Sequence, residues 1–188
     1  MLVGIMLVSG RRAGSRLSLR SVITYRAPGR ILDYVAWPVG LYLFWALASQ
    51  AVRPMSGRLE AWYLGWFPAQ LGTHALVRGV ADAPPGQRHV TLVLAILLSG
   101  LLAPVLEEAY FRGFLLPRMS RLGRAAPVIS AFLFGLYHFF APWGLPVIFV
   151  AFLPIAFVVQ AKENFRIGVV VHAMFNLTGA LTLFLGST

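Results

Sequence analysis

The sequence has no cysteine and very few acidic residues, and both absences restrict what the protein can be. Without cysteine, the chain of 188 residues forms no disulfide bond and no thiolate metal site. Charged residues make up 12% and hydrophobic residues 59% of the chain. Soluble domains have about 25% charged and about 45–50% apolar residues. We therefore expect an integral membrane protein, and the length favours a single domain.

Basic residues outnumber the acidic residues sixteen to six, which gives a formal net charge of +10. A strong positive charge is also typical of nucleic-acid-binding proteins. Here, however, nearly all basic residues are Arg, and they cluster between apolar runs. That pattern is typical of membrane topology and of contacts with anionic lipid headgroups. We expect anionic lipid headgroups as partners and no nucleic acid.

The apolar runs are long enough to cross a membrane as helices. A spanning helix needs about twenty mainly apolar residues. The strong candidates are residues 31–52, residues 90–116, residues 125–161 (long enough for two spans, with a turn at 141–144) and residues 167–185. The sequence therefore predicts an all-α fold, a polytopic transmembrane helix bundle with about five to six spans.

Residues 61–77 decide the span count. They carry no charge, but polar and helix-breaking residues interrupt them, so this stretch either crosses the bilayer or lies in the interface. Three basic clusters, at residues 11–30, 118–124 and 162–166, all face the cytoplasm if it does not cross. We expect an inner (plasma) membrane protein of a bacterium, with its N-terminus in the cytoplasm.

The chain divides into three regions. Residues 1–30 are expected to be a basic cytoplasmic N-terminal arm, either disordered or partly an over-long start, with no evident cleavable signal peptide. Residues 31–89 hold the first span and the weak second span or interfacial segment. Residues 90–188 hold the helix bundle that carries the polar motifs.

Two of the six acidic residues stand side by side in an apolar run. A carboxylate near the bilayer centre costs about 2.5–3.5 kcal/mol, so acids within a membrane are usually functional. Glu108 and Arg112 are spaced to share one helix face and to pair. Glu107 points about 100° away and stays free to act as a base. The alternative is a helix-end ion pair at the headgroup level, which leaves Glu107 without a role.

Two later helices add polar side chains. A lone His in an apolar helix, such as His138, is more often a packed structural residue. His172 and Asn176 share one face of the last predicted helix and present an imidazole and an amide to a common point. Each of these groups can also bridge helices structurally. The chain has only four His and two Asn, and their recurrence on consecutive spans favours one shared functional site.

The order Glu-Glu-x-x-x-Arg, Phe-x-x-x-His, His-x-x-x-Asn resembles the motifs of the CPBP intramembrane proteases. This is the group of the type II CAAX prenyl endopeptidases and bacteriocin-processing membrane proteins. The resemblance covers residues 90–185, so this region is expected to be a CPBP-like catalytic helix bundle. The catalytic residues that the resemblance implies are Glu107, Glu108, Arg112, His138, His172 and Asn176.

Within this set, the resemblance implies that Glu107 and His138 activate a water for attack on a peptide carbonyl. It implies that His172 and Asn176 polarise that carbonyl as an oxyanion hole, while the remaining Glu and Arg support the geometry. The chemistry agrees, because peptide hydrolysis without a Ser or Cys nucleophile needs a base for water and donors for the developing oxyanion.

Zinc is an alternative, since Glu107, His138 and His172 are a possible His₂Glu ligand set. The sequence has no His-Glu-x-x-His, and an amide suits an oxyanion donor better than a zinc ligand, so we expect no cofactor. The predicted function is an intramembrane endopeptidase acting on a membrane-associated protein or peptide. The alternatives are a non-catalytic membrane protein of the same fold, such as an immunity or assembly factor, and a proton or ion pathway.

Overall fold

The computed structural model describes residues 1–12, 19–68, 70 and 72–185, and this part of the chain is almost entirely helical. The separate helices in it are α1 (Leu2–Arg12), α2 (Asp33–Leu64), α3 (Thr73–Ala81), α7 (Ala125–Tyr137), α8 (Leu145–Lys162) and α9 (Phe165–Leu185). A composite helix covers Pro85–Arg118. It consists of α4 (Pro85–Leu94), the π-helical η3 (Ala95–Leu102), α5 (Ala103–Glu108), the π-helical η4 (Ala109–Leu115) and α6 (Leu116–Arg118). Short 3-10 turns are η1 (Leu19–Ser21), η5 (Ser120–Leu122) and η6 (Pro142–Gly144).

Four of the described helical stretches are long and apolar enough to cross a membrane. They are Asp33–Leu64, Pro85–Arg118, Pro142–Lys162 and Phe165–Leu185. The apolar helix α7 has 13 residues, fewer than the about twenty that a span needs. The predicted all-α polytopic bundle is confirmed, and its fifth expected span corresponds to this short helix.

Residues 61–77 contain no helix long enough to span in their described part. The first four of them complete α2, and the nine-residue α3 begins at Thr73. Positions 69 and 71 lie outside the described residues. The helix α2 also continues well past the predicted end at residue 52 and contains Pro54. The charged residues that end the apolar run do not end the helix, which is why the sequence predicted this element too short.

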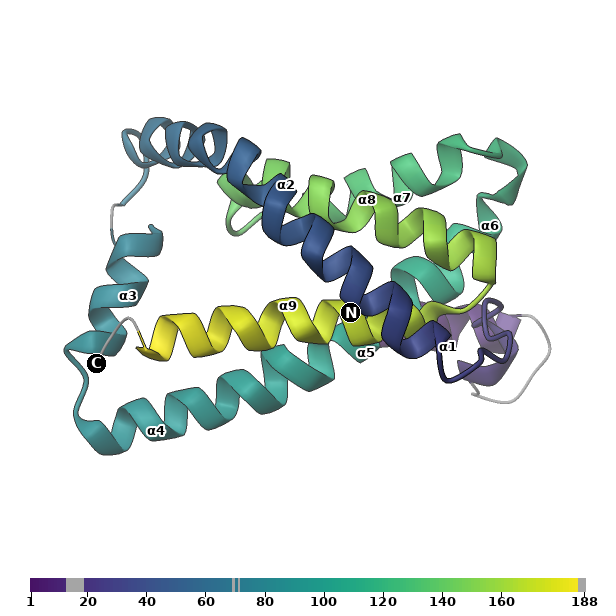
Figure 1. Cartoon of the computed structure of the whole chain (residues 1–188), viewed down its shortest axis with the longest axis horizontal. Coiled ribbons are helices and arrows are strands. Elements are labelled where there is room, and N and C mark those ends of the chain that lie inside the picture. The colour runs from purple at the N-terminus through teal and green to yellow at the C-terminus, as the bar shows by residue number, and fades with distance from the viewer. Residues whose placement is uncertain (13–18, 69, 71, 186–188) are drawn as a thin grey trace.

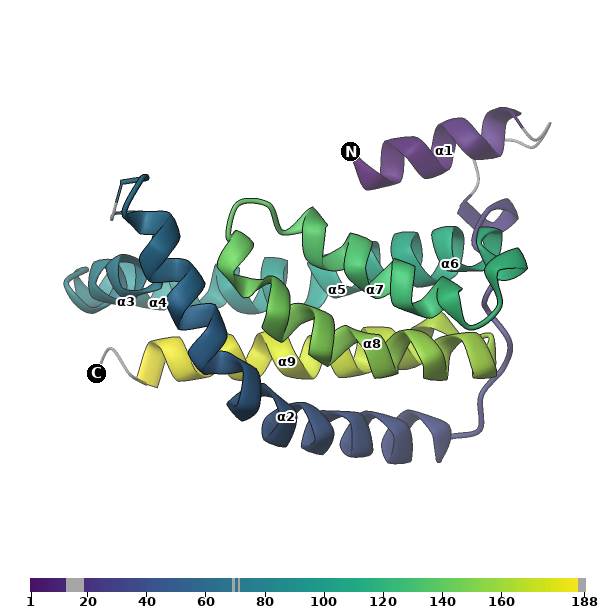
Figure 2. The same cartoon turned by 90° about the horizontal axis from the view of Figure 1, so that it is seen from above.

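The bundle packs around α8 and α9. The helix α8 lies between α7 and α2, and α9 contacts α2, α5 and η3. Figure 2 shows α7, α8 and α9 with nearly parallel axes and α2 along one side, and the chain in α8 runs opposite to that in α7 and α9. Side chains at these contacts are fully buried, including Phe134, Ile155 and Val159. On the outer faces, residues such as Leu47 (77% exposed) are open, as expected for helices that face lipid.

The helix α2 also fixes the middle of α9 through aromatic and polar contacts. The rings of Trp45 and Phe175 are stacked with their centroids 4.8 Å apart. Tyr42 and Thr178 share a hydrogen bond of 2.8 Å between their hydroxyls. Asn176 lies between these two α9 residues, so contacts with α2 hold the helix on both sides of it.

The chain before α2 is attached to the bundle. In α1, Leu2 and Met6 are buried, and the helix packs against η1, α5 and η4. Further along, the amide of Thr24 donates to the carbonyl of Gly113 at 2.8 Å, and the amide of Phe165 donates to the carbonyl of Tyr25 at 3.0 Å. Residues 13–18 of the predicted N-terminal arm lie outside the described residues. Figure 2 shows α1 along the outside of the bundle, on the side opposite to α2.

At Gly168, the backbone of α9 passes close to the Glu108 side chain of α5. A Cβ atom placed on this glycine would overlap Oε2 of Glu108 and would lie 3.2 Å from its Cδ. A methyl group of Ile155 on α8 would be 3.4 Å away on another side. Only glycine therefore lets the backbone of α9 pass the buried Glu108 carboxylate.

We predict that Gly168→Ala destabilises the protein and that Gly179→Ala, on the same helix, does not. The added methyl group at position 168 meets the Glu108 carboxylate, and overpacking of this kind costs about 1–3 kcal/mol. No atom of the described residues lies within 4 Å of a Cβ at position 179, so alanine there gains about 1 kcal/mol of helix propensity. Thermal unfolding in detergent measures the change in stability of each variant. A melting temperature of Gly168→Ala equal to or above that of Gly179→Ala contradicts the prediction.

Candidate active site

The composite helix positions the Glu pair between two π-helical segments. The α-helical turn α5 ends at Glu108, and η3 and η4 lie directly before and after it. Segments of π-helix are rare and occur frequently at functional sites, because the widened turn changes where side chains project. The two carboxylates leave the helix in different directions, and Glu107 has a side chain 14% exposed while that of Glu108 is fully buried.

The ion pair that the sequence predicts is present. Arg112 Nη1 donates to Glu108 Oε1 at 3.2 Å, and both side chains are fully buried. The guanidinium carbon lies 4.4 Å from the ring centroid of Phe134 and 5.1 Å from that of Phe152. Among the described residues, Glu108 Oε2 and two nitrogens of Arg112 have no hydrogen-bond partner. The aromatic faces, whose π electrons attract cations, occupy the space around the guanidinium instead.

His172 connects the two acidic side chains. Its Nδ1 lies 3.2 Å from Glu108 Oε1, and its Nε2 lies 3.8 Å from Glu107 Oε2. Because an ionised carboxylate only accepts hydrogen bonds, Nδ1 must carry the proton and donate to Glu108. A neutral His172 then has a bare Nε2, and a doubly protonated one points a second N–H toward Glu107. In that doubly protonated form, two positive and two negative groups balance within the cluster.

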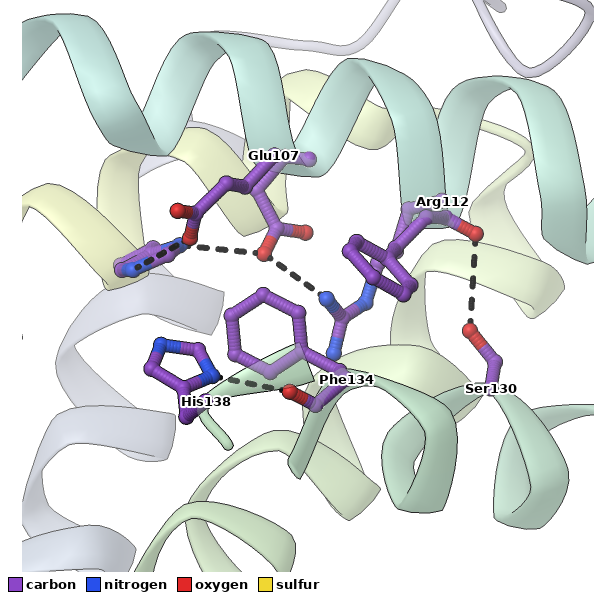
Figure 3. A network of polar contacts seen from close by, with 8 residues as sticks. Glu107, Arg112, Ser130, Phe134 and His138 are labelled. Atoms are coloured by element: carbon purple, nitrogen blue, oxygen red, sulfur yellow. Dashed lines mark hydrogen bonds and ion pairs between the residues drawn. The ribbon is translucent and has the colours of Figure 1, made fainter. Parts of the chain in front are cut away.

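His138 lies one residue beyond the end of α7, rather than within the helix as the sequence predicted. Its Nδ1 is 2.8 Å from the carbonyl oxygen of Phe134. This nitrogen donates, because a carbonyl accepts, so the side chain also satisfies one of the last carbonyls of the helix. The neutral ring therefore keeps a free electron pair on Nε2. Figure 3 shows His138 and Phe134 across from Glu107 and Arg112.

Asn176 lies on α9 with one amide hydrogen in use. Its Nδ2 donates to the carbonyl oxygen of Ser99 in η3 at 2.7 Å. An amide nitrogen carries two hydrogens, so one donor remains available. This bond fixes the amide on the wall of a cavity of about 410 Å³ between the composite helix and α9. The polar side chains on that wall include Glu107 and His138.

The structure brings the predicted residues together in two layers, one on the wall of a cavity and one buried behind that wall. Glu107, His138 and Asn176 line one cavity. Behind Glu107, the buried side chains of Glu108, Arg112 and His172 form a connected chain of contacts. The predicted catalytic role of each residue stays a prediction, because position alone does not measure turnover.

Sequence reasoning did not assign roles to several residues that build this site. Phe134 contacts the Arg112 guanidinium, and its ring centroid is 4.8 Å from that of His138 and 5.5 Å from that of His172. Its place four residues before His138 on an apolar helix was the available signal. Gly168, four residues before His172, offered a similar signal. No pattern in the sequence pointed to the carbonyl of Ser99.

The side chains do not fit the zinc alternative. No three His, Asp or Glu side chains among the described residues are grouped closely enough to hold a metal ion. The site has the composition of an acid–base and hydrogen-bonding centre, and a metalloendopeptidase-like arrangement of Glu107, His138 and His172 is not supported.

Comparison with known families agrees with this geometry. Residues 89–178 match the family described as Rce1-like, type II CAAX prenyl endopeptidase Rce1-like. This stretch includes all six predicted site residues. No curated protein and no solved structure gives a significant match. The four apolar helices and this match make the chain an integral membrane protein. Through residues 89–178, the chain is similar to the Rce1-like type II CAAX prenyl endopeptidases, and this match supports the CPBP family to which the sequence motifs pointed.

Proposed function

We propose that the protein is an intramembrane endopeptidase that hydrolyses a peptide bond in a membrane-associated protein or peptide. The observation that carries this proposal is the shared cavity lined by Glu107, His138 and Asn176. It offers a carboxylate and an imidazole as bases and an amide N–H as a donor, in a space bounded by apolar helices. The family match supports the same activity.

In the proposed mechanism, Glu107 is the general base that takes a proton from the attacking water. His138 Nε2 has its electron pair free, so it accepts a hydrogen bond from the same water and orients it. The free amide hydrogen of Asn176 donates to the carbonyl oxygen as negative charge develops on it. The protonated Glu107 then returns the proton to the leaving amine. No metal ion takes part in these steps.

We propose that His172 acts on this centre through Glu107. Its Nδ1 is held by Glu108, which Arg112 holds in turn, so the ring cannot rotate without breaking a buried hydrogen bond. A proton on Nε2 would orient Glu107 and place positive charge near the developing oxyanion. Glu108 and Arg112 are therefore positioning residues, comparable to the buried carboxylate that orients the histidine of a catalytic triad.

The contacts favour hydrolysis over the proton-pathway alternative. A relay needs polar groups that continue from one side of the membrane to the other. The chain of contacts from Glu107 through His172 and Glu108 ends at Arg112. The described neighbours of its guanidinium include the rings of Phe134 and Phe152.

We propose a cytoplasmic N-terminus in a bacterial inner membrane, with anionic lipid headgroups around that face. Residues 19–30, the turn after α6 and the α8–α9 turn meet at one end of the bundle (Figure 1). Arg26 pairs with Asn164 through an isolated backbone bridge there, and Gln160 donates to the carbonyl of Gly123. The basic clusters that the sequence assigned to the cytoplasm therefore share one end, consistent with the excess of Lys and Arg on that side of membrane proteins.

We predict that Glu107→Gln abolishes cleavage, because glutamine keeps the shape of the side chain and cannot accept a proton. A general base contributes about 10²–10⁴ in rate, and His138→Ala should lose a similar factor. Mass spectrometry of termini in membranes containing the wild type or a variant measures this. The matched control is Asp82→Asn, the same chemical change at an exposed residue beyond α3. If both site variants process the same termini as the wild type, the proposed function is wrong.

We predict that Asn176→Ala lowers kcat by about 10²–10³, which is the usual effect of removing one oxyanion donor. KM should change little, because the donor acts on charge that develops after binding. Thr182→Ala is the control on the same helix, since its hydroxyl bonds only to the carbonyl of Thr178 in the described contacts. Steady-state cleavage of a synthetic peptide in proteoliposomes separates the two constants. An unchanged kcat for Asn176→Ala removes the amide from the mechanism.

A further inference from the structure

Glu107 borders a second, smaller cavity that the mechanism above does not use. This cavity has a volume of about 210 Å³ and meets the larger one at Ala103 and Glu107. One helical turn separates these two residues, so they form a common wall. The other lining residues are Met1, Leu2, Val3, Leu106 and Tyr137. Glu107 is therefore reachable from two sides.

The start of α1 forms one wall of this smaller cavity, and α1 is held in place. Met6 is fully buried in a cluster with Val22, Ala109 and Phe114. Arg118 fixes the segment that follows, because its Nη1 donates to the carbonyl of Val22 at 3.1 Å. The helix is too short to cross a membrane, since it has 11 residues and a span needs about twenty. Its position against α5 makes it part of the site rather than a separate span.

The α1 wall lies outside the stretch that matches the family. That match begins at residue 89, whereas the α1 residues that line the cavity are at positions 1–3. The composite helix and α7 supply the opposite side through Leu106 and Tyr137. The shape of this cavity is therefore set jointly by the catalytic bundle and by a chain segment that the family match does not cover.

We propose that this smaller cavity is a subsite for one uncharged side chain of the substrate, next to the scissile bond, and that α1 sets its size. The inference rests on the proposed peptidase function. Successive side chains of an extended peptide point to opposite faces. When the scissile carbonyl faces Asn176 in the larger cavity, a neighbouring side chain points past Glu107 into the smaller one.

The lining of the subsite decides what it accepts. Apart from Glu107 and the Tyr137 hydroxyl, its side chains are aliphatic or thioether groups. A charged side chain would lose its hydration there. An acidic one would also face the Glu107 carboxylate, and a basic one would pair with Glu107 and so occupy the proposed base. The volume of about 210 Å³ is below the about 300–1,000 Å³ of pockets that hold whole small molecules. The cavity therefore fits a single side chain and excludes a helix.

The test compares variants that narrow and widen the subsite. The synthetic peptides copy the sequence around the bond that the wild type cleaves. In each peptide, one of the two residues that flank this bond is replaced by Ala, Leu or Phe. The kcat/KM of each peptide is measured in proteoliposomes. The quantity compared is the ratio of kcat/KM for the Leu or Phe peptide to kcat/KM for the Ala peptide. At one flanking position, Val3→Trp should lower this ratio by about 10-fold or more. Leu106→Ala should raise the same ratio, so a folding defect in one variant leaves the other informative.

The control is Ile5→Trp, the same bulky residue on a part of α1 that is 40% exposed and does not line the cavity. It should leave the ratio as in the wild type. If the wild type cleaves but neither Val3→Trp nor Leu106→Ala changes the ratio, the subsite is wrong and the peptidase proposal stands. If Glu107→Gln cleaves these peptides as fast as the wild type, the peptidase proposal is wrong and the subsite proposal falls with it.

Discussion

The architecture of the site depends on one carboxylate oxygen. Glu108 Oε1 accepts from Arg112 Nη1 and from His172 Nδ1, each at 3.2 Å, in a fully buried position. Burying an ion pair is expensive, and removing one partner typically costs about 3–5 kcal/mol because the other charge is left uncompensated. The pair is therefore a poor way to gain stability and a good way to hold an imidazole at one orientation. In the proposed mechanism, this fixed imidazole is what orients Glu107 at the cavity wall.

Aromatic rings surround the charged cluster. Phe134 and Phe152 both lie against the Arg112 guanidinium and against His172. The ring centroids of Phe152 and His172 are 4.7 Å apart. These rings exclude solvent while still interacting favourably with a cation. A low effective dielectric strengthens every charge interaction of the cluster, including those that the proposed chemistry uses.

The ion pair and most of the long helices could be predicted from the sequence, because both depend on residues that are close together in the chain. The i,i+4 spacing of Glu108 with Arg112 predicted the ion pair, and apolar runs predicted most of the long helices. What could not be predicted depends on distant partners. The extension of α2 past residue 52, the end of α7 just before His138 and the hydrogen bond from Asn176 to Ser99 follow from packing between helices. The predicted zinc alternative used residue types alone, and types do not show whether the three side chains gather closely enough to hold an ion.

The contacts made by the first part of the chain define how large the cooperative folding unit is. Tyr42 and Trp45 hold the segment of α9 around Asn176, and the backbone of Tyr25 receives the amide that begins α9. All three lie before residue 89, where the family match starts. A recombinant fragment limited to the matched stretch would keep every proposed catalytic side chain and lose the scaffold that orients α9. The minimal autonomous module is therefore longer than the homologous segment.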